Sequence, residues 1–66
     1  MNILCNGEER EIAPGTSIGV LLKDLGLDPD SVVAECDSRI LKREEYDTFV
    51  LDEGAALELI RFVGGG

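Results

Sequence analysis

The sequence predicts an α+β domain in which a sheet of four to five short strands packs against one main helix. Three features lead to this prediction: an Asn-Gly pair between strand-like runs, a capped segment with apolar residues at helical spacing, and a final apolar run followed by glycines. The predicted order of elements is ββ-α-ββ-β. A chain of 66 residues forms one domain. We expect residues 1–63 to form that domain and residues 64–66 to form a flexible tail.

The first predicted element is a β-hairpin with strands at residues 3–5 and 8–12. Asn6-Gly7 lies between them and supplies the positive φ angles that a two-residue hairpin turn requires. Pro14-Gly15 then ends the second strand.

A helix is predicted next, with Thr16 or Ser17 placed to cap its N-terminus. Gly26 follows as a left-handed C-terminal stop, and Pro29 prevents the helix from continuing. The apolar residues of this helix fall on one face: Ile18, Leu21, Leu22 and Leu25.

The second half of the chain is predicted to complete the sheet. Tyr46 and Phe49 are expected to anchor a loop on the core. The other predicted segments are a strand at 32–36, a turn at 37–38, a short strand at 40–41, one helical turn at 42–45, a turn at 52–54 and the last strand at 56–63.

The composition excludes several classes of function. A net charge of −8, from 14 acidic and 6 basic residues, would repel nucleic acid. The chain contains two cysteines and no histidine, so we expect no metal site and no cofactor. It shows no secretory signal and no membrane span, and the expected compartment is therefore the cytoplasm, where both thiols stay reduced.

Neither an enzyme nor a cysteine-based carrier fits the residues. No histidine is present to act as a base near neutral pH, and the paired acids Glu8-Glu9 and Glu44-Glu45 fall on segments expected to be exposed. Cys5 and Cys36 fall on strand positions expected to point inward, where a thiol is unreactive. We therefore predict that the chain is not an enzyme.

The glycines at residues 64–66 offer no side-chain chemistry, so their reactive group would be the terminal carboxylate of Gly66. Without Cβ atoms, Gly64 and Gly65 can enter a narrow tunnel and adopt backbone angles that other residues avoid. The alternative is that these glycines are an unstructured chain end without a role.

These features resemble the thiamine-biosynthesis sulfur carrier (ThiS) family, whose fold is the ubiquitin-like β-grasp. The resemblance extends along the whole chain and is most specific in its last seven residues. The residues that carry it are Met1-Asn2-Ile3, Asn6-Gly7-Glu8, Leu21-Leu22, Leu25-Gly26-Leu27-Asp28-Pro29 and Ile60-Arg61-Phe62-Val63-Gly64-Gly65-Gly66. The resemblance implies a mixed sheet with the last strand central, beside the first.

The resemblance also implies a chemistry for Gly66. An ATP-dependent, E1-like adenylating enzyme would activate its carboxylate, a sulfur donor would convert it to a thiocarboxylate, and a thiazole synthase would accept the sulfur. The same fold and a terminal Gly-Gly also serve molybdopterin synthesis, as a sulfur-bearing small subunit, and protein conjugation. An interaction module with an inert tail is a further alternative.

The β-grasp fold also predicts a docking surface on the last strand. Side chains alternate along a strand, so Leu57 and Leu59 should face the helix while Ile60 and Phe62 face the other way. An exposed apolar cluster next to a reactive end is typical of an interaction site. The expected partner-binding residues are Ile60, Arg61, Phe62 and Val63.

Overall fold

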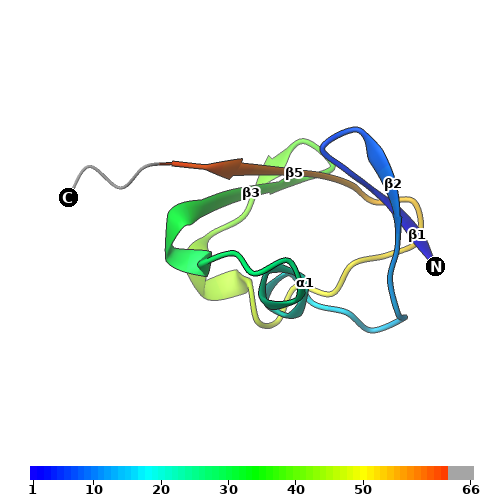
Figure 1. The fold of residues 1–66 in the computed structure, drawn as a ribbon, viewed down its shortest axis with the longest axis horizontal. Helices are drawn as coiled ribbons and strands as arrows, with labels where there is room; N and C mark the ends of the chain where they lie inside the picture. Colours follow the sequence, from blue (N-terminus) through cyan, green and yellow to red (C-terminus); the bar gives the residue numbers. More distant parts are fainter. Residues whose placement is uncertain (63–66) are drawn as a thin grey trace.

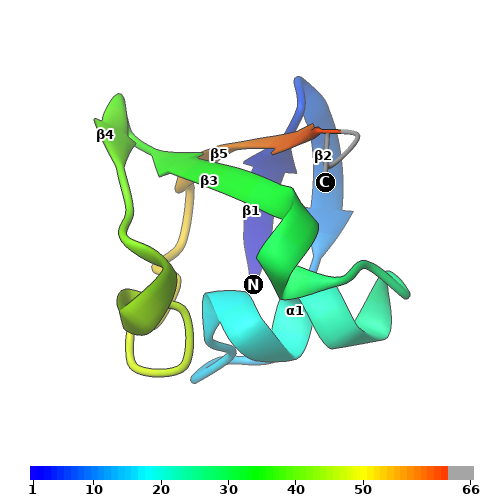
Figure 2. The ribbon, with the colours of Figure 1, turned by 90° about the vertical axis from the view of Figure 1, so that its left-hand side faces the viewer.

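A computed structural model describes residues 1–62 of the chain. One five-stranded sheet, in the order β2-β1-β5-β3-β4, packs on a single α-helix (Figures 1 and 2). The α+β prediction is thereby confirmed. The elements are β1 (Asn2–Cys5), β2 (Glu8–Glu11), α1 (Ile18–Asp24), the 3₁₀ turn η1 (Pro29–Ser31), β3 (Val32–Cys36), β4 (Arg39–Ile40), the 3₁₀ turn η2 (Arg43–Glu45) and β5 (Ala56–Arg61).

The last strand lies in the centre of the sheet, as the family resemblance implied. β5 runs parallel to β1, with Leu4 beside Ala56, and antiparallel to β3, with Val33 beside Ile60. The two hairpins, β1–β2 and β3–β4, flank it as antiparallel pairs. The sheet is therefore mixed, and β5 is held between the two halves of the chain.

Both hairpin turns have the predicted positions and the expected backbone angles. Asn6 and Gly7 have φ angles of 52° and 80°, and Asp37 and Ser38 have φ angles of 50° and 71°. Two consecutive positive φ angles match the twist of the flanking strands. Asp37 also fixes the start of β5, since its backbone N–H donates to the Ala56 carbonyl at 2.8 Å and its Oδ1 accepts from the Ala56 N–H at 2.9 Å.

The helix is bounded at both ends by its sequence signals. Ser17 is the N-cap, and its hydroxyl accepts a hydrogen bond from the backbone N–H of Val20 at 3.2 Å. At the other end Gly26 has a φ of 73°, and the N–H of Leu27 donates to the Leu22 carbonyl at 2.9 Å. This is a Schellman stop. Ile18, Leu21 and Leu22 are buried as predicted, while Leu25 is only half-buried at the C-cap.

The hydrophobic core lies between α1 and one face of the sheet. Tyr46 is buried in it, whereas Phe49 is half-buried and packs against its edge, so both loop anchors lie where they were expected. The core is built from Ile3, Ile18, Leu21, Leu22, Val32, Ala34, Cys36, Leu41, Tyr46, Leu51, Ala55, Leu57 and Leu59.

Apart from shifts of one residue at the ends of β1, β2, β4 and η2, the structure differs from the sequence prediction at two places. Pro29, expected only to prevent helix continuation, opens η1, because Asp28 Oδ1 accepts from the Asp30 N–H at 2.9 Å and caps a new turn. The last strand ends at Arg61 and not at Val63, which lies outside the described residues. Within residues 1–62 no helix combines the length and the apolar character that crossing a bilayer requires.

Candidate functional site

β5 is the strand that leads to the glycines, and its side chains alternate as predicted. Leu57 and Leu59 face the core and are buried, with Leu59 8% exposed. Ile60 and Phe62 are 55% and 47% exposed. Arg61 is exposed as well. The other four expected site residues, Val63, Gly64, Gly65 and Gly66, lie outside the described residues.

β3 accompanies β5 along its whole length as its antiparallel neighbour. The ladder pairs Cys36 with Leu57 at one end and Val32 with Arg61 at the other. One further bond follows, from the N–H of Phe62 to the Ser31 carbonyl at 3.0 Å. The backbone next to the glycines is therefore fixed to the folded domain up to Phe62.

On the β1 side, the side chain of Asn6 continues the pairing after β1 has ended. Its Oδ1 accepts from the Leu59 N–H at 2.7 Å, and its Nδ2 donates to the Leu59 carbonyl at 3.3 Å. The backbone N–H of Asn6 also donates to the Leu57 carbonyl at 2.8 Å. The sequence indicated Asn6 only as a turn residue. Its second role depends on where β5 lies, which the Asn-Gly signal does not reveal.

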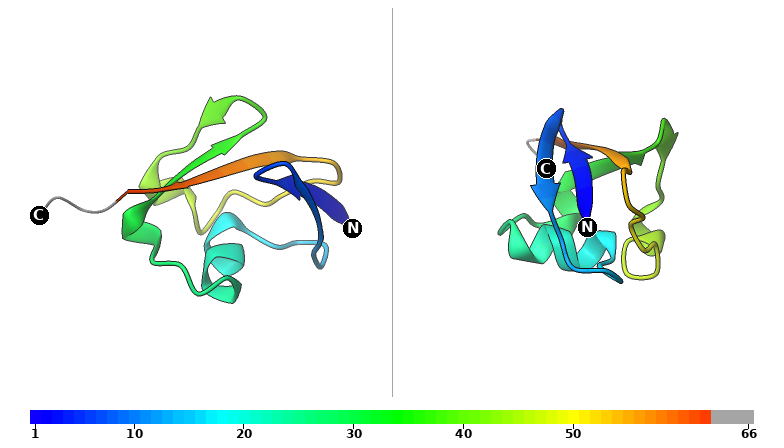
Figure 3. Two further views of the ribbon diagram at one scale, coloured as in Figure 1. Left: turned by 45° about the horizontal axis from the view of Figure 1, so that its top comes forward. Right: turned by 90° about the vertical axis from the view of Figure 1, so that its right-hand side faces the viewer.

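The face of the sheet opposite the helix carries exposed apolar side chains. α1 and the loop that contains η2 both lie on the other side (Figures 2 and 3). Leu4, Ile40 and Ile60 are exposed large hydrophobic residues, and Val33, the cross-strand neighbour of Ile60, is only half-buried. Ile60 lies beside Val33, and Val33, Ile40 and Phe62 line one shallow hollow, so we call Val33, Ile40, Ile60 and Phe62 the outer apolar cluster.

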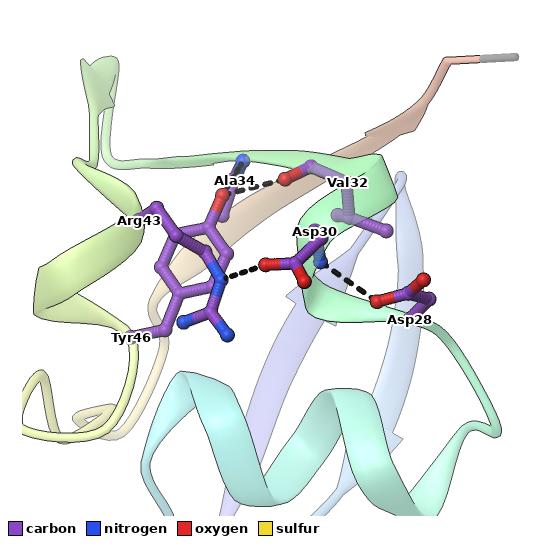
Figure 4. A network of polar contacts seen from close by, with 6 residues as sticks. All are labelled: Asp28, Asp30, Val32, Ala34, Arg43 and Tyr46. Carbon is purple, nitrogen blue, oxygen red and sulfur yellow. Dashed lines mark hydrogen bonds and ion pairs between the residues drawn. The ribbon is translucent and has the colours of Figure 1, made fainter. Parts of the chain in front are cut away.

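Tyr46 closes the free edge of β3 through its hydroxyl group (Figure 4). This hydroxyl donates to the Val32 carbonyl at 2.6 Å and accepts from the Ala34 N–H at 3.2 Å. The Arg43 guanidinium lies over the tyrosine ring, 5.3 Å from its centre, and its Nε donates to Asp30 at 2.8 Å. The edge of β3 between residues 32 and 34 is therefore unavailable to another strand. The sequence indicated Tyr46 as a core anchor but gave no sign of this hydroxyl bridge.

The two thiols lie in surroundings that keep them protonated. Cys36 is buried, as expected, and burial together with the neighbouring Asp37 carboxylate raises its pKa. Cys5 is half-buried, and burial raises its pKa as well, while the guanidinium of Arg10 partly opposes this shift. Since the thiolate is the nucleophile, these positions do not favour a cysteine that carries sulfur.

The paired acids have structural or solvated positions. Glu8, Glu9 and Glu44 are exposed, as predicted. Glu45 is partly covered, and its carboxylate accepts from the Lys42 N–H at 2.9 Å and pairs with Arg39. The hydrogen bond from Lys42 lowers the pKa of this carboxyl, so Glu45 stays ionised and caps η2. Residues 1–62 contain no cluster of three or more His, Cys, Asp or Glu side chains that could hold a metal ion.

Comparison with known proteins gives one family and several relatives. The sequence model of the ThiS family matches residues 3–66. The chain is 33% identical over 66 residues to a thiazole synthase of Paramagnetospirillum magneticum and 36% identical over 66 residues to a thiazole synthase of Magnetococcus marinus. Each match covers 100% of this chain and 20% of the relative, so the chain spans about a fifth of the length of these curated relatives.

Solved structures from Geobacter metallireducens share the whole fold. The crystal structure of the thiamine biosynthesis protein ThiS superimposes with a TM-score of 0.85 at 30% identity and covers 100% of both chains. The solution structure of a thiamine biosynthesis protein gives a TM-score of 0.81 at 30% identity and covers 100% of this chain and 88% of the other.

Proposed function

Because the chain belongs to the ThiS family, we propose that it carries sulfur for thiamine biosynthesis on the carboxylate of Gly66. The observation that supports this most strongly is the position of β5. This strand is held by β3 as far as Phe62, four residues before Gly66. The fold thus fixes the base of the glycine segment, and three glycines leave its tip narrow enough to enter another protein's active site.

The proposed chemistry proceeds in two steps on Gly66. A carboxylate is a poor electrophile, so an ATP-dependent, E1-like adenylating enzyme first joins a carboxylate oxygen to the α-phosphorus of ATP, and pyrophosphate leaves. Hydrosulfide, supplied by a donor system, then attacks the acyl carbon and displaces AMP. The product is a thiocarboxylate, which is ionised at neutral pH and can pass its sulfur to an acceptor.

Thiazole synthase is the proposed acceptor. Two relatives that bear this name contain a segment similar to the whole of this chain, and that segment makes up 20% of each. A carrier segment within the same polypeptide would stay close to the synthase active site. This arrangement supports a pairing between this chain and a thiazole synthase.

We also propose that catalysis belongs to these partners and not to this chain. The paired acids are exposed or bound to backbone, and the thiols are held protonated. The proposed docking segment is Ile60, Arg61, Phe62 and Val63, because Ile60 and Phe62 are exposed apolar residues at the base of the glycine segment. A cytoplasmic location would give the chain access to ATP and these partners.

Intact-mass spectrometry tests the proposal directly. After incubation with ATP, a sulfur source and the adenylating enzyme, the chain should show one exchange of oxygen for sulfur, located on Gly66 by fragmentation. A chain that lacks Gly65 and Gly66 should not load, yet its melting temperature should match that of the parent. Sulfur found on Cys5 or Cys36, or normal loading of the shortened chain, would contradict the proposal. Transfer of the sulfur to a molybdopterin precursor, but not to a thiazole synthase, would contradict the role in thiamine biosynthesis and assign the chain to molybdopterin synthesis.

A further inference from the structure

The backbone groups of β5 point alternately toward its two neighbouring strands. The Leu57 carbonyl and both backbone groups of Leu59 bond to Asn6, on the β1 side, whereas the N–H of Phe62 bonds to Ser31 on the β3 side. Arg61 is two residues beyond Leu59, so its backbone groups point to the same side as those of Leu57 and Leu59. Its N–H and C=O face the β1 side of the sheet.

No described part of the chain pairs with Arg61 on that side. β1 ends at Cys5, and its pairing with β5 stops at Leu57. The side chain of Asn6 extends the pairing to Leu59 and no further, so the Arg61 N–H and C=O have no hydrogen-bond partner within residues 1–62. Figures 1 and 3 show that β5 continues beyond the β1–β2 hairpin, with only β3 beside it. Arg61 thus lies on an open sheet edge.

A hollow of about 320 Å³ lies beside this edge. Leu25, Leu27 and Leu59 give it apolar surface, and its polar part comes from Asn6, the carboxylates of Glu8 and Glu9 and the guanidinium groups of Arg10 and Arg61. In a strand paired with Arg61, the residue opposite Arg61 points to the same face of the sheet as Arg61 does. The hollow is therefore placed to receive one side chain from an added strand.

We propose that an extended segment of the enzyme that activates Gly66 adds to β5 at Arg61 as a further strand and places one side chain in this hollow. The inference rests on the proposed function, because that function brings such an enzyme to the end of β5. Strand addition satisfies one free N–H and one free C=O at once, which suits an extended backbone. An added strand would also align the enzyme with the residues that follow Arg61 in the sequence.

A second copy of this chain fits the edge poorly. Each copy has a net charge of −8, so two copies repel one another. An antiparallel pairing of two β5 edges centred on Arg61 would also place Arg61 directly opposite Arg61, and like charges in that position are unfavourable. The edge of β3 cannot be the site of strand addition, because Tyr46 already bonds to Val32 and Ala34.

Amide hydrogen exchange, measured residue by residue, tests the inference on the unmodified chain. In the free chain the Arg61 amide should exchange rapidly, while the Phe62 amide, bonded to Ser31, serves as the protected internal control. In the complex saturated with the adenylating enzyme, exchange at Arg61 should slow by at least about tenfold. An Arg61 amide that exchanges as fast in the complex as in the free chain would overturn strand addition.

A pair of variants isolates the backbone donor. Arg61→Pro removes the N–H that faces the open edge and leaves the Phe62–Ser31 bond to β3 in place. Arg61→Ala removes the guanidinium but keeps the N–H. Arg61→Pro should therefore load sulfur about 10 to 100 times more slowly than Arg61→Ala. Equal rates would refute the inference while leaving sulfur loading intact, whereas a parent chain that never loads would refute the proposed function and strand addition with it.

Discussion

Leu59 and Ile60 are neighbours on β5, yet we expect aspartate substitutions at these positions to have opposite effects. Leu59 is 8% exposed and packs in the core, while Ile60 is 55% exposed on the outer face. Leu59→Asp should unfold the domain. Ile60→Asp should remain folded and lose affinity for the adenylating enzyme and the thiazole synthase.

The expected magnitudes follow from burial. A domain of 66 residues has a free energy of unfolding of about 3–10 kcal/mol. Leu59→Asp would forfeit about 2–3 kcal/mol of apolar burial, and an unpaired carboxylate in the core adds roughly several kcal/mol more. The sum matches or exceeds the whole stability. Ile60 keeps about half of its surface in water, so Ile60→Asp should cost only about 1 kcal/mol.

Circular dichroism and urea unfolding measure the folding of both variants, and isothermal titration calorimetry measures binding. Ile60→Asp should keep the parent spectrum and weaken binding to each partner by more than about 1 kcal/mol, the loss typical of an interface anchor. Phe62 is 47% exposed, so Phe62→Asp should behave in the same way.

Two results would refute this reasoning. If Ile60→Asp unfolds as Leu59→Asp does, the assignment of faces on β5 is wrong. If Ile60→Asp and Phe62→Asp both fold and bind the two partners as tightly as the parent, the outer apolar cluster is not the docking surface.

Three further predictions concern the core, the thiols and pH. Tyr46→Phe should lower the free energy of unfolding in urea by about 1–3 kcal/mol, because it leaves the buried Val32 carbonyl and Ala34 N–H without their hydrogen-bond partner. The double variant Cys5→Ala, Cys36→Ala should still accept sulfur in the intact-mass assay. Its free energy of unfolding should fall by about 1 kcal/mol, mostly from Cys36, which is buried. The Glu45 carboxyl has a pKa below its ordinary value of 4.5, so it stabilises the fold above that pH and loses this effect as pH falls through the lowered pKa. In Glu45→Gln, the melting temperature should therefore fall less than in the parent as the pH drops below 4.5.

Local signals predicted the elements well because each depends on a few adjacent residues. Asn6-Gly7 can adopt two positive φ angles, and Ser17 and Gly26 mark the two ends of α1. The alternation of Leu59 and Ile60 on β5 follows from the period of a strand. These predictions need no knowledge of distant contacts, so the sequence was sufficient for them.

The features that the sequence did not predict join residues far apart along the chain. The Tyr46 hydroxyl bonds to Val32, 14 residues away, and the Asn6 amide bonds to Leu59, 53 residues away. Both bonds replace a missing strand partner, and that need arises only once the sheet has formed. The turn η1 was missed for a different reason, because Asp28-Pro29 signals the end of one helix and the start of the next turn equally well.

The open edge at Arg61 shows how such a feature arises from strand lengths. β1 has 4 residues and β5 has 6, and Leu4 pairs with Ala56, so β1 ends beside Leu57. The Asn6 side chain covers one further pair of backbone groups, at Leu59. β3, in contrast, accompanies β5 to Arg61. Within residues 1–62, the difference leaves one donor and one acceptor free on the strand that leads to the glycines, next to the residues the proposed partner must reach. A longer first strand would have closed this edge, so the hairpin turn at Asn6-Gly7 sets both the register of the sheet and the access to β5.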